Sequence, residues 1–282
     1  MPRGGTAANA VIVTGATGLI GPHLLPLLLE RGSLPRAMQA DRVALDLSAP
    51  PIASALAPAS ALIHTAPIWL LPPWLGTFAR LGVRRLVVFS STSRFTKQDS
   101  SSPHERALAS RLTGAESAVE AAAARLGLRW TILRPTLIYD PGQGRNVSDI
   151  ARFVRRWGFF PIAGDGKGRR QPVHAADLAT AAVALLGNPA TFDRSYDLPG
   201  GETLTYAEMI RRIARGRGRK PGLIHVPVPL LRAGAPVLCK LPRWRHVTPD
   251  MADRMNEDLV FDSGPARRDS GYDPRPFRPP GE

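Results

Sequence analysis

Short apolar runs alternate with longer amphipathic stretches through the first half of the chain. The runs are four to six residues long and often β-branched, which is typical of buried strands: Ala10–Thr14, Ala61–Thr65, Arg85–Ser90 and Trp130–Leu133. Leucine and alanine recur at helical spacing between them, most clearly over Pro22–Arg31 and Pro103–Leu126. This alternation predicts an α/β fold with a parallel sheet covered by helices on both faces.

A glycine-rich junction joins the first expected strand to the first expected helix. It places Gly15, Gly18 and Gly21 three residues apart. Gly15 permits a tight turn, Gly18 lets the backbone approach a diphosphate, and Gly21 lets the helix pack close to the sheet. The helix N-terminus then offers N–H groups to the phosphates. The first βα unit therefore predicts dinucleotide binding and a Rossmann-type, doubly wound sheet.

The pattern loosens after Asp140, where loops and shorter helices replace the regular alternation. Residues 8–165 are expected to form the dinucleotide-binding Rossmann domain. Residues 166–275 are expected to contribute to the sheet and to form a small substrate lobe, and residues 276–282 to form a loose tail. A helix is predicted over Thr205–Arg215, because Thr205 and Glu208 have the spacing of a capping box.

The formal net charge of +14 raises the question of a nucleic-acid partner. Only four of the 37 basic residues are lysine, the charges are spread along the chain, and no nucleic-acid-binding motif accompanies them. A phosphorylated small molecule explains the excess more economically, so no nucleic-acid partner is expected. The single cysteine, Cys239, and the absence of a secretory signal favour a cytoplasmic location.

Several segments, in their order and spacing, resemble the short-chain dehydrogenase/reductase superfamily, specifically its extended epimerase/dehydratase-like branch. They are the glycine junction at residues 13–21 and the segments ALIHTAP (61–67), RRLVVFSSTS (84–93), WTILRPTLIYDPG (130–142) and RRQPVHAADLA (169–179). The resemblance covers about residues 10–275 and implies NAD or NADP as cofactor. It places the catalytic serine at Ser91 and a substrate-phosphate contact at Arg170.

The same resemblance implies a set of cofactor-binding positions around the junction and the strand ends. They are Thr14, Gly15, Thr17, Gly18, Leu19, Ile20, Gly21, His64, Thr65, Ala66, Arg111 and Pro135. Asp41 and Arg42 lie where an acidic residue would favour NAD and an arginine NADP. The pattern does not decide between the two coenzymes, and a turn residue is the preferred interpretation of Asp41.

The family's catalytic Tyr-x-x-x-Lys pair has no counterpart in this chain. The alignment puts Ala107 at the tyrosine position and Arg111 at the lysine position, and none of the four tyrosines is followed by lysine at that offset. Arg111 retains a permanent charge that suits a ribose hydroxyl but makes it a poor proton carrier. The candidate substitutes as proton carriers are His104, Tyr139 and His174, although a purely structural role is the favoured interpretation of each.

Two functions follow from this pattern. The first is an NAD(P)-dependent oxidoreductase or epimerase/dehydratase acting on a nucleotide sugar or similar phosphorylated metabolite, and it is favoured because the lobe has the length to hold a substrate. The second is a catalytically atypical dinucleotide-binding regulator or assembly subunit. No metal site is expected. A homodimer, and contact of residues 227–241 with a membrane surface, stay open, although a helix closing the lobe is the preferred interpretation of that segment.

Overall fold

The computed structural model describes residues 10–32, 34–35, 47–48, 56–141, 143–144, 146–216, 222–231 and 249–279. Its centre is a parallel six-stranded sheet in the order β10-β5-β4-β3-β1-β2. The strands are β1 (Ala10–Thr14), β2 (Leu34–Pro35), β3 (Ala61–His64), β4 (Arg85–Phe89), β5 (Arg129–Pro135) and β10 (Arg194–Leu198). β2 and β3 flank β1 on opposite sides, so the strand order reverses at β1. The predicted doubly wound α/β fold is confirmed.

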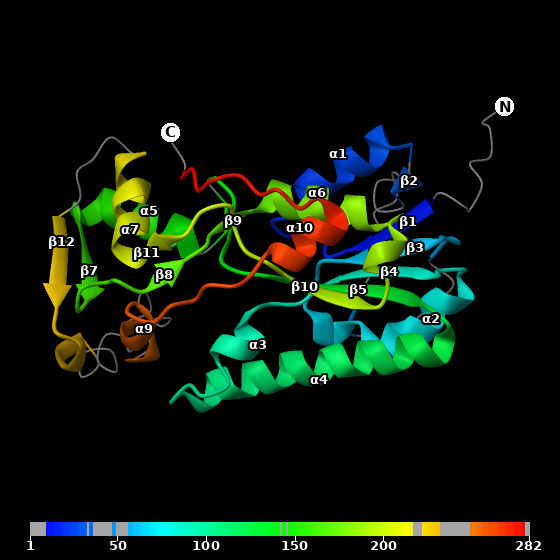
Figure 1. Ribbon diagram of the computed structural model, residues 1–282, viewed down its shortest axis with the longest axis horizontal. Helices are drawn as coiled ribbons and strands as arrows, with labels where there is room; N and C mark the ends of the chain where they lie inside the picture. Colours follow the sequence, from blue (N-terminus) through cyan, green and yellow to red (C-terminus); the bar gives the residue numbers. More distant parts are fainter. Residues whose placement is uncertain are drawn as a thin grey trace.

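Helices cover both faces of this sheet (Figure 1). On one face lie α1 (Gly21–Glu30), α6 (Ala175–Leu185) and α10 (Gly264–Ser270), packed on Val11 and Val13 of β1. On the other lie α2 (Leu75–Arg80) and α4 (Pro103–Leu126), packed against Ile12 and Leu62. Successive β1 side chains thus enter opposite cores, as expected for a strand buried on both faces.

A smaller lobe lies beyond one end of the sheet, at the left of Figure 1. Its main elements are α5 (Asn146–Trp157), β7 (Phe159–Ala163), α7 (Tyr206–Arg215), β12 (Gly222–Val226) and α9 (Pro249–Arg254). β12 pairs with β7, and α5 and α7 bury a core that includes Val147, Ile162 and Ile210. α7 begins as predicted, since the Thr205 hydroxyl accepts the Glu208 N–H at 3.1 Å.

Short elements connect the sheet to the lobe. β6 (Ile138–Tyr139) pairs with β9 (Val173–His174), and β8 (Arg169–Arg170) pairs with β11 (Leu204–Thr205). The remaining short pieces are α3 (Ser93–Thr96) and the 3-10 turns η3 (Ile68–Leu70), η4 (Pro72–Trp74) and η5 (Pro189–Thr191).

The C-terminal segment differs from the loose tail predicted from residue 276. Phe277 is buried, its ring packs edge-on against Tyr139 with the centroids 4.8 Å apart, and the Arg278 N–H donates to the Tyr139 hydroxyl. One aromatic side chain therefore holds this proline- and arginine-rich segment in place as far as Pro279. Most of the helix predicted over residues 227–241 lies outside the described residues.

Among the described helices, none combines the length and the apolar character needed to cross a bilayer.

Candidate functional site

The carboxyl ends of β1 and β3 meet where the strand order reverses. Gly15, directly after β1, has φ +78°, and a Cβ built on it would lie 2.4 Å from the Ala66 nitrogen. Only glycine fits this conformation and this contact. The Gly18 N–H donates to the Gly15 carbonyl at 2.9 Å and closes the turn. The loop after β1 therefore lies directly against the backbone at the end of β3, at the switch point where open α/β sheets bind ligands in the crevice outside the strand ends.

The first helix starts at this crevice with its N-terminal donors uncapped by side chains. A Cβ on Gly21 would lie 1.8 Å from the Ala16 carbonyl oxygen, so glycine is required where the helix leaves the loop. Ile20 is the N-cap residue and makes no side-chain cap, and Pro22 lacks one N–H. The His23 N–H donates to the Ile20 carbonyl at 3.1 Å, which leaves the Gly21 N–H and the positive end of the helix dipole to suit an anion. The residues present fit the diphosphate of a dinucleotide.

His64 and Thr14 tie β1 to β3 beneath the crevice. The His64 Nε2 lies 3.2 Å from the Pro67 carbonyl oxygen, which can only accept, so Nε2 carries the proton and Nδ1 accepts from the Thr14 hydroxyl at 2.7 Å. Burial lowers the pKa of His64 to about 4. The imidazole is fully buried and neutral. Thr65 adds a second tie, through its hydroxyl to the Thr14 carbonyl at 2.9 Å.

The residues expected around the reacting centre lie on separate elements. Ser91 follows β4, is partly exposed, and its hydroxyl accepts the Ser93 N–H at 3.1 Å. Arg111 is exposed on α4, with its guanidinium 4.2 Å above the ring of Trp69 in η3. His104 and Ala107 are exposed near the start of the same helix. No hydrogen bond or ion pair within the described part of the chain joins Ser91, His104 and Tyr139.

Tyr139 and Arg170 are largely engaged in packing. The Tyr139 ring is buried between His174 and Phe277, and burial raises the pKa of its hydroxyl. The Arg170 guanidinium donates to the carbonyls of Arg169, Arg254 and Glu257. Burial lowers the pKa of Arg170. Both assignments, Tyr139 as proton carrier and Arg170 as phosphate contact, stay predictions.

A buried charge cluster at the other half of this sheet edge was not predicted. Glu116 of α4 is 1% exposed and accepts from the Ser90 hydroxyl at 2.5 Å, from Arg94, and from Arg134 Nη2 at 2.7 Å. Asp197 at the end of β10 lies 3.8 Å from Arg134, and burial raises its pKa. The sequence signal that could have predicted this cluster is the position of Glu116, an acidic residue on the apolar face of α4 between Leu112 and Val119.

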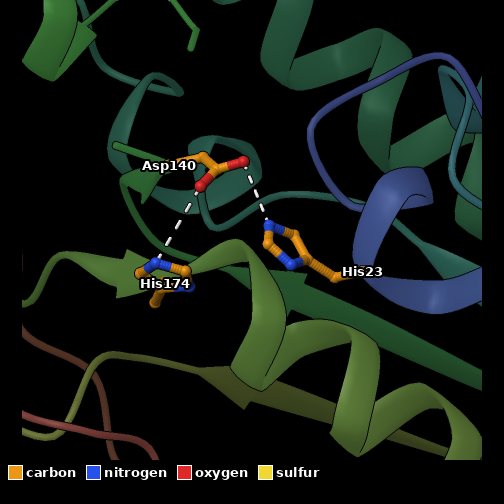
Figure 2. Close-up of side chains that lie close together, drawn as sticks. All are labelled: His23, Asp140 and His174. Carbon is orange, nitrogen blue, oxygen red and sulfur yellow. Dashed lines mark hydrogen bonds and ion pairs between the residues drawn. The ribbon is translucent and has the colours of Figure 1, made fainter. Parts of the chain in front are cut away.

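A second unpredicted cluster joins α1 to the connection after β6 (Figure 2). The Asp140 carboxylate lies between two imidazoles, 3.0 Å from His23 Nε2 and 3.9 Å from His174 Nε2. His23 is two residues beyond Gly21, and His174 caps α6 through Nδ1, which accepts the Ala176 N–H at 3.0 Å. The three ligand atoms are close enough to suggest a metal. However, the cap puts the proton of neutral His174 on Nε2, so this nitrogen faces Asp140 as a donor and has no lone pair for a metal ion.

Other implied cofactor residues have mixed positions. Thr17 and Gly18 are exposed at the crevice, and Leu19 packs against the turn at Gly144. The Pro135 carbonyl accepts the Thr92 hydroxyl at 3.1 Å. Asp41 and Arg42, on which the choice of coenzyme depends, lie outside the described residues.

The fold and the glycine crevice define a dinucleotide-binding protein of the Rossmann class. Residues 74–198 match the NAD dependent epimerase/dehydratase family. The predicted resemblance to this family is thus confirmed over residues 74–198, and NAD or NADP is the cofactor that the family implies.

Three characterised relatives are similar to this chain. The mitochondrial NADH dehydrogenase (ubiquinone) 1 alpha subcomplex subunit 9 of Arabidopsis thaliana is 29% identical over 45% of this chain and 31% of its own length. The ceramide reductase of Caulobacter vibrioides is 28% identical over 93% of this chain and 84% of its own. The UDP-glucose 4-epimerase of Vibrio cholerae is 24% identical over 68% and 59%. The match thus spans less than two thirds of the first and third relatives.

Solved structures share the fold across the chain. MoeE5 in complex with UDP-glucose and NAD has a TM-score of 0.68 at 21% identity, covering 95% of this chain and 94% of that one. RMD from Pseudomonas aeruginosa, complexed with NADPH, has a TM-score of 0.68 at 17% identity, covering 95% and 94%. At these identities the likeness shows the common fold.

Proposed function

We propose that the protein binds NAD or NADP in the Gly15–Gly21 crevice and acts as an oxidoreductase or epimerase/dehydratase on a small molecule held between the sheet edge and the lobe. The observation that carries this proposal is the glycine-lined meeting of β1 and β3, which no residue with a Cβ could form at Gly15 or Gly21. The bound coenzyme would supply the hydride acceptor or donor. The chain's own residues would bind and orient it.

Each half of the site has a distinct task in this proposal. The loop amides and the start of α1 hold the diphosphate, while the buried His64–Thr14 tie keeps the two strand ends at a fixed spacing. Ser91 would bind a substrate oxygen, and Arg111 would reach a ribose hydroxyl after leaving the Trp69 ring. A nucleotide sugar is the first substrate class to test, because the Vibrio cholerae relative is a UDP-glucose epimerase. Since Arg170 is bonded to carbonyl groups, binding of the sugar-nucleotide phosphates would depend on other cations or on release of Arg170.

The test combines binding with turnover. Titration with NADH and NADPH, followed by nicotinamide fluorescence, should give saturable binding of at least one coenzyme. The protein should then oxidise, reduce or epimerise a member of a panel of UDP- and GDP-sugars. Binding without turnover on a panel that also includes ketones and long-chain amides would argue against the enzyme. Failure to bind either coenzyme would contradict the whole proposal.

A non-catalytic dinucleotide-binding subunit is the second candidate, and one observation favours it. In the predicted alignment, Ala107 and Arg111 stand at the positions of the family's proton-transferring pair, and burial raises the pKa of Tyr139, which is the wrong direction for a base. The Arabidopsis thaliana relative, which bears the name of a subunit, is consistent with this candidate. The double variant Ala107→Tyr/Arg111→Lys separates the two. A gain of turnover from an inactive parent supports the subunit, whereas a parent already active at enzymic rates excludes it.

A further inference from the structure

The described residues of the 140–144 turn (140, 141, 143 and 144) contact the dinucleotide loop at one point and the helix that follows it at another. At one end, Asp140 bonds to His23, two residues beyond the last loop glycine. At the other end, Gly144 with φ +80° lies so close to Leu19 that a Cβ on it would be 3.0 Å from the Leu19 Cδ1 atom. The Gln143 N–H donates to the Asp140 carbonyl, and the Gln143 carbonyl accepts the Ser148 hydroxyl from α5. The turn is thus hydrogen-bonded to α5 of the lobe and packs against Leu19 of the loop.

Asp140 is held from both sides in this arrangement. Its side chain is 9% exposed, and each carboxylate oxygen faces a different imidazole (Figure 2). The His174 ring is fixed by its cap on α6 and by edge-on contacts with Tyr139 and His23. Burial lowers the pKa of His174, and the nearby Arg275 lowers it further, so this imidazole is neutral at pH 7 and presents an N–H to the carboxylate. The position of Asp140 is therefore set by α6, and that of His23 by α1.

We propose that Asp140 is a positioning residue for the dinucleotide: through His23 and His174 it fixes the 140–144 turn against the Gly15–Gly21 loop and thereby sets the affinity for the diphosphate. This inference rests on the proposed coenzyme site and adds the element that controls it. Without the carboxylate, the turn keeps only its apolar contact at Leu19, and the first turn of α1 loses its polar tie to the lobe. In the proposed function, the first turn of α1 would hold the diphosphate, so this part of the coenzyme would lose affinity first.

The closing experiment compares Asp140→Ala with Asp177→Ala. Asp177 is a matched control, since it is similarly buried, is also ion-paired (to Arg275) and lies on the same helix that His174 caps, but it has no bond to the described residues of the 140–144 turn. Dissociation constants are measured for the intact coenzyme, for ADP-ribose and for AMP, which lacks the diphosphate. We expect Asp140→Ala to weaken the coenzyme and ADP-ribose about tenfold and AMP less than twofold. Asp140→Asn, which keeps an acceptor for His23, should recover most of the affinity.

Equal losses for all three ligands, or the same loss in both alanine variants, would overturn the proposal. If the parent protein binds neither coenzyme, the proposed function fails. Amide hydrogen exchange of residues 15–24 then tests separately whether Asp140 ties the turn to the loop. Faster exchange in Asp140→Ala than in Asp177→Ala supports the tie between turn and loop. Equal exchange in the two variants refutes it.

Discussion

The two halves of the sheet's carboxyl edge are built on opposite plans. At the ends of β1 and β3, Gly15 and Gly21 have no side chain, so the backbone segments lie in direct contact. The N-terminus of α1 has no side-chain cap. At the ends of β4 and β5, charged side chains of the protein occupy the edge, where the Glu116 carboxylate accepts hydrogen bonds from Ser90, Arg94 and Arg134. The first half is prepared for an external anion. In the second half an internal anion already occupies the donors.

This difference separates binding from chemistry. The glycines stand where the proposed coenzyme would be held by backbone, because a Cβ at Gly15 or Gly21 would collide with a neighbouring strand or loop. The predicted alignment puts the departures from the family at Ala107 and Arg111, where side chains would do the chemistry. Coenzyme binding and turnover can therefore be lost independently. The following variants test the charged half and the glycine half of the sheet edge separately.

The largest effect is expected at the charge-filled half. Glu116→Ala should lower the free energy of unfolding by about 4 kcal/mol, because it leaves two largely buried guanidinium groups without their carboxylate. Denaturant unfolding measures the change. Glu120→Ala, one turn further along α4, is the control and should cost less than about 1 kcal/mol. Similar costs for the two variants would mean that the cluster is not a special feature of this edge.

At the glycine half, adding a single methyl group at Gly21 should lower the stability nearly as much. Gly21→Ala forces the new Cβ into the Ala16 carbonyl, so we expect a loss of about 3 kcal/mol in stability and a loss of coenzyme binding. Gly114→Ala on α4 meets nothing within 4 Å and should stabilise the protein by up to about 1 kcal/mol. A well-folded Gly21→Ala variant with unchanged affinity would disprove the close-approach argument.

The buried His64 makes the stability of the protein depend on pH. Its pKa falls from 6.5 to about 4 on folding, so between these values only the unfolded chain takes up the proton. Stability from this group is complete above pH 6.5 and declines as the pH falls toward 4, by about 2 kcal/mol at pH 5. Unfolding curves at pH 7 and pH 5 measure it. The pH difference should shrink in His64→Gln and persist in His225→Gln, an exposed control.

The smallest effect is expected for an ion pair outside both halves. Arg129 and Asp193 pair at 2.6 Å, but their side chains are 65% and 37% exposed. Arg129→Ala should change stability by less than about 1 kcal/mol, and added salt should reduce the difference further. A cost approaching that of Glu116→Ala would show that burial does not distinguish the two kinds of pair.

The regular part of the fold was predictable because its signals are local. The helix predicted over Pro103–Leu126 has those bounds in the structure, and the Thr205 cap was visible in four residues of sequence. The glycine crevice was predictable for a related reason. Backbone contacts that exclude a Cβ leave their mark directly on the residues involved.

The charge-built parts were not predictable, because their partners are set by packing. Glu116 meets Arg134 only because α4 lies against β5, and Asp140 meets His174 because β6 pairs with β9. Buried arginines pose the same difficulty. Arg85 donates to the Leu185 carbonyl and to the hydroxyls of Thr131 and Thr191. Such contacts also place part of the formal positive charge inside the molecule, away from any surface partner.

The late position of β10 along the sequence has a consequence for how the molecule is made. β10 begins at Arg194 and pairs with β5, whose last residue is Pro135, and the ring of Tyr139 packs against Phe277. A growing polypeptide on the ribosome therefore has an open β5 edge until residues 194–198 emerge, and an uncovered tyrosine until residue 277 does.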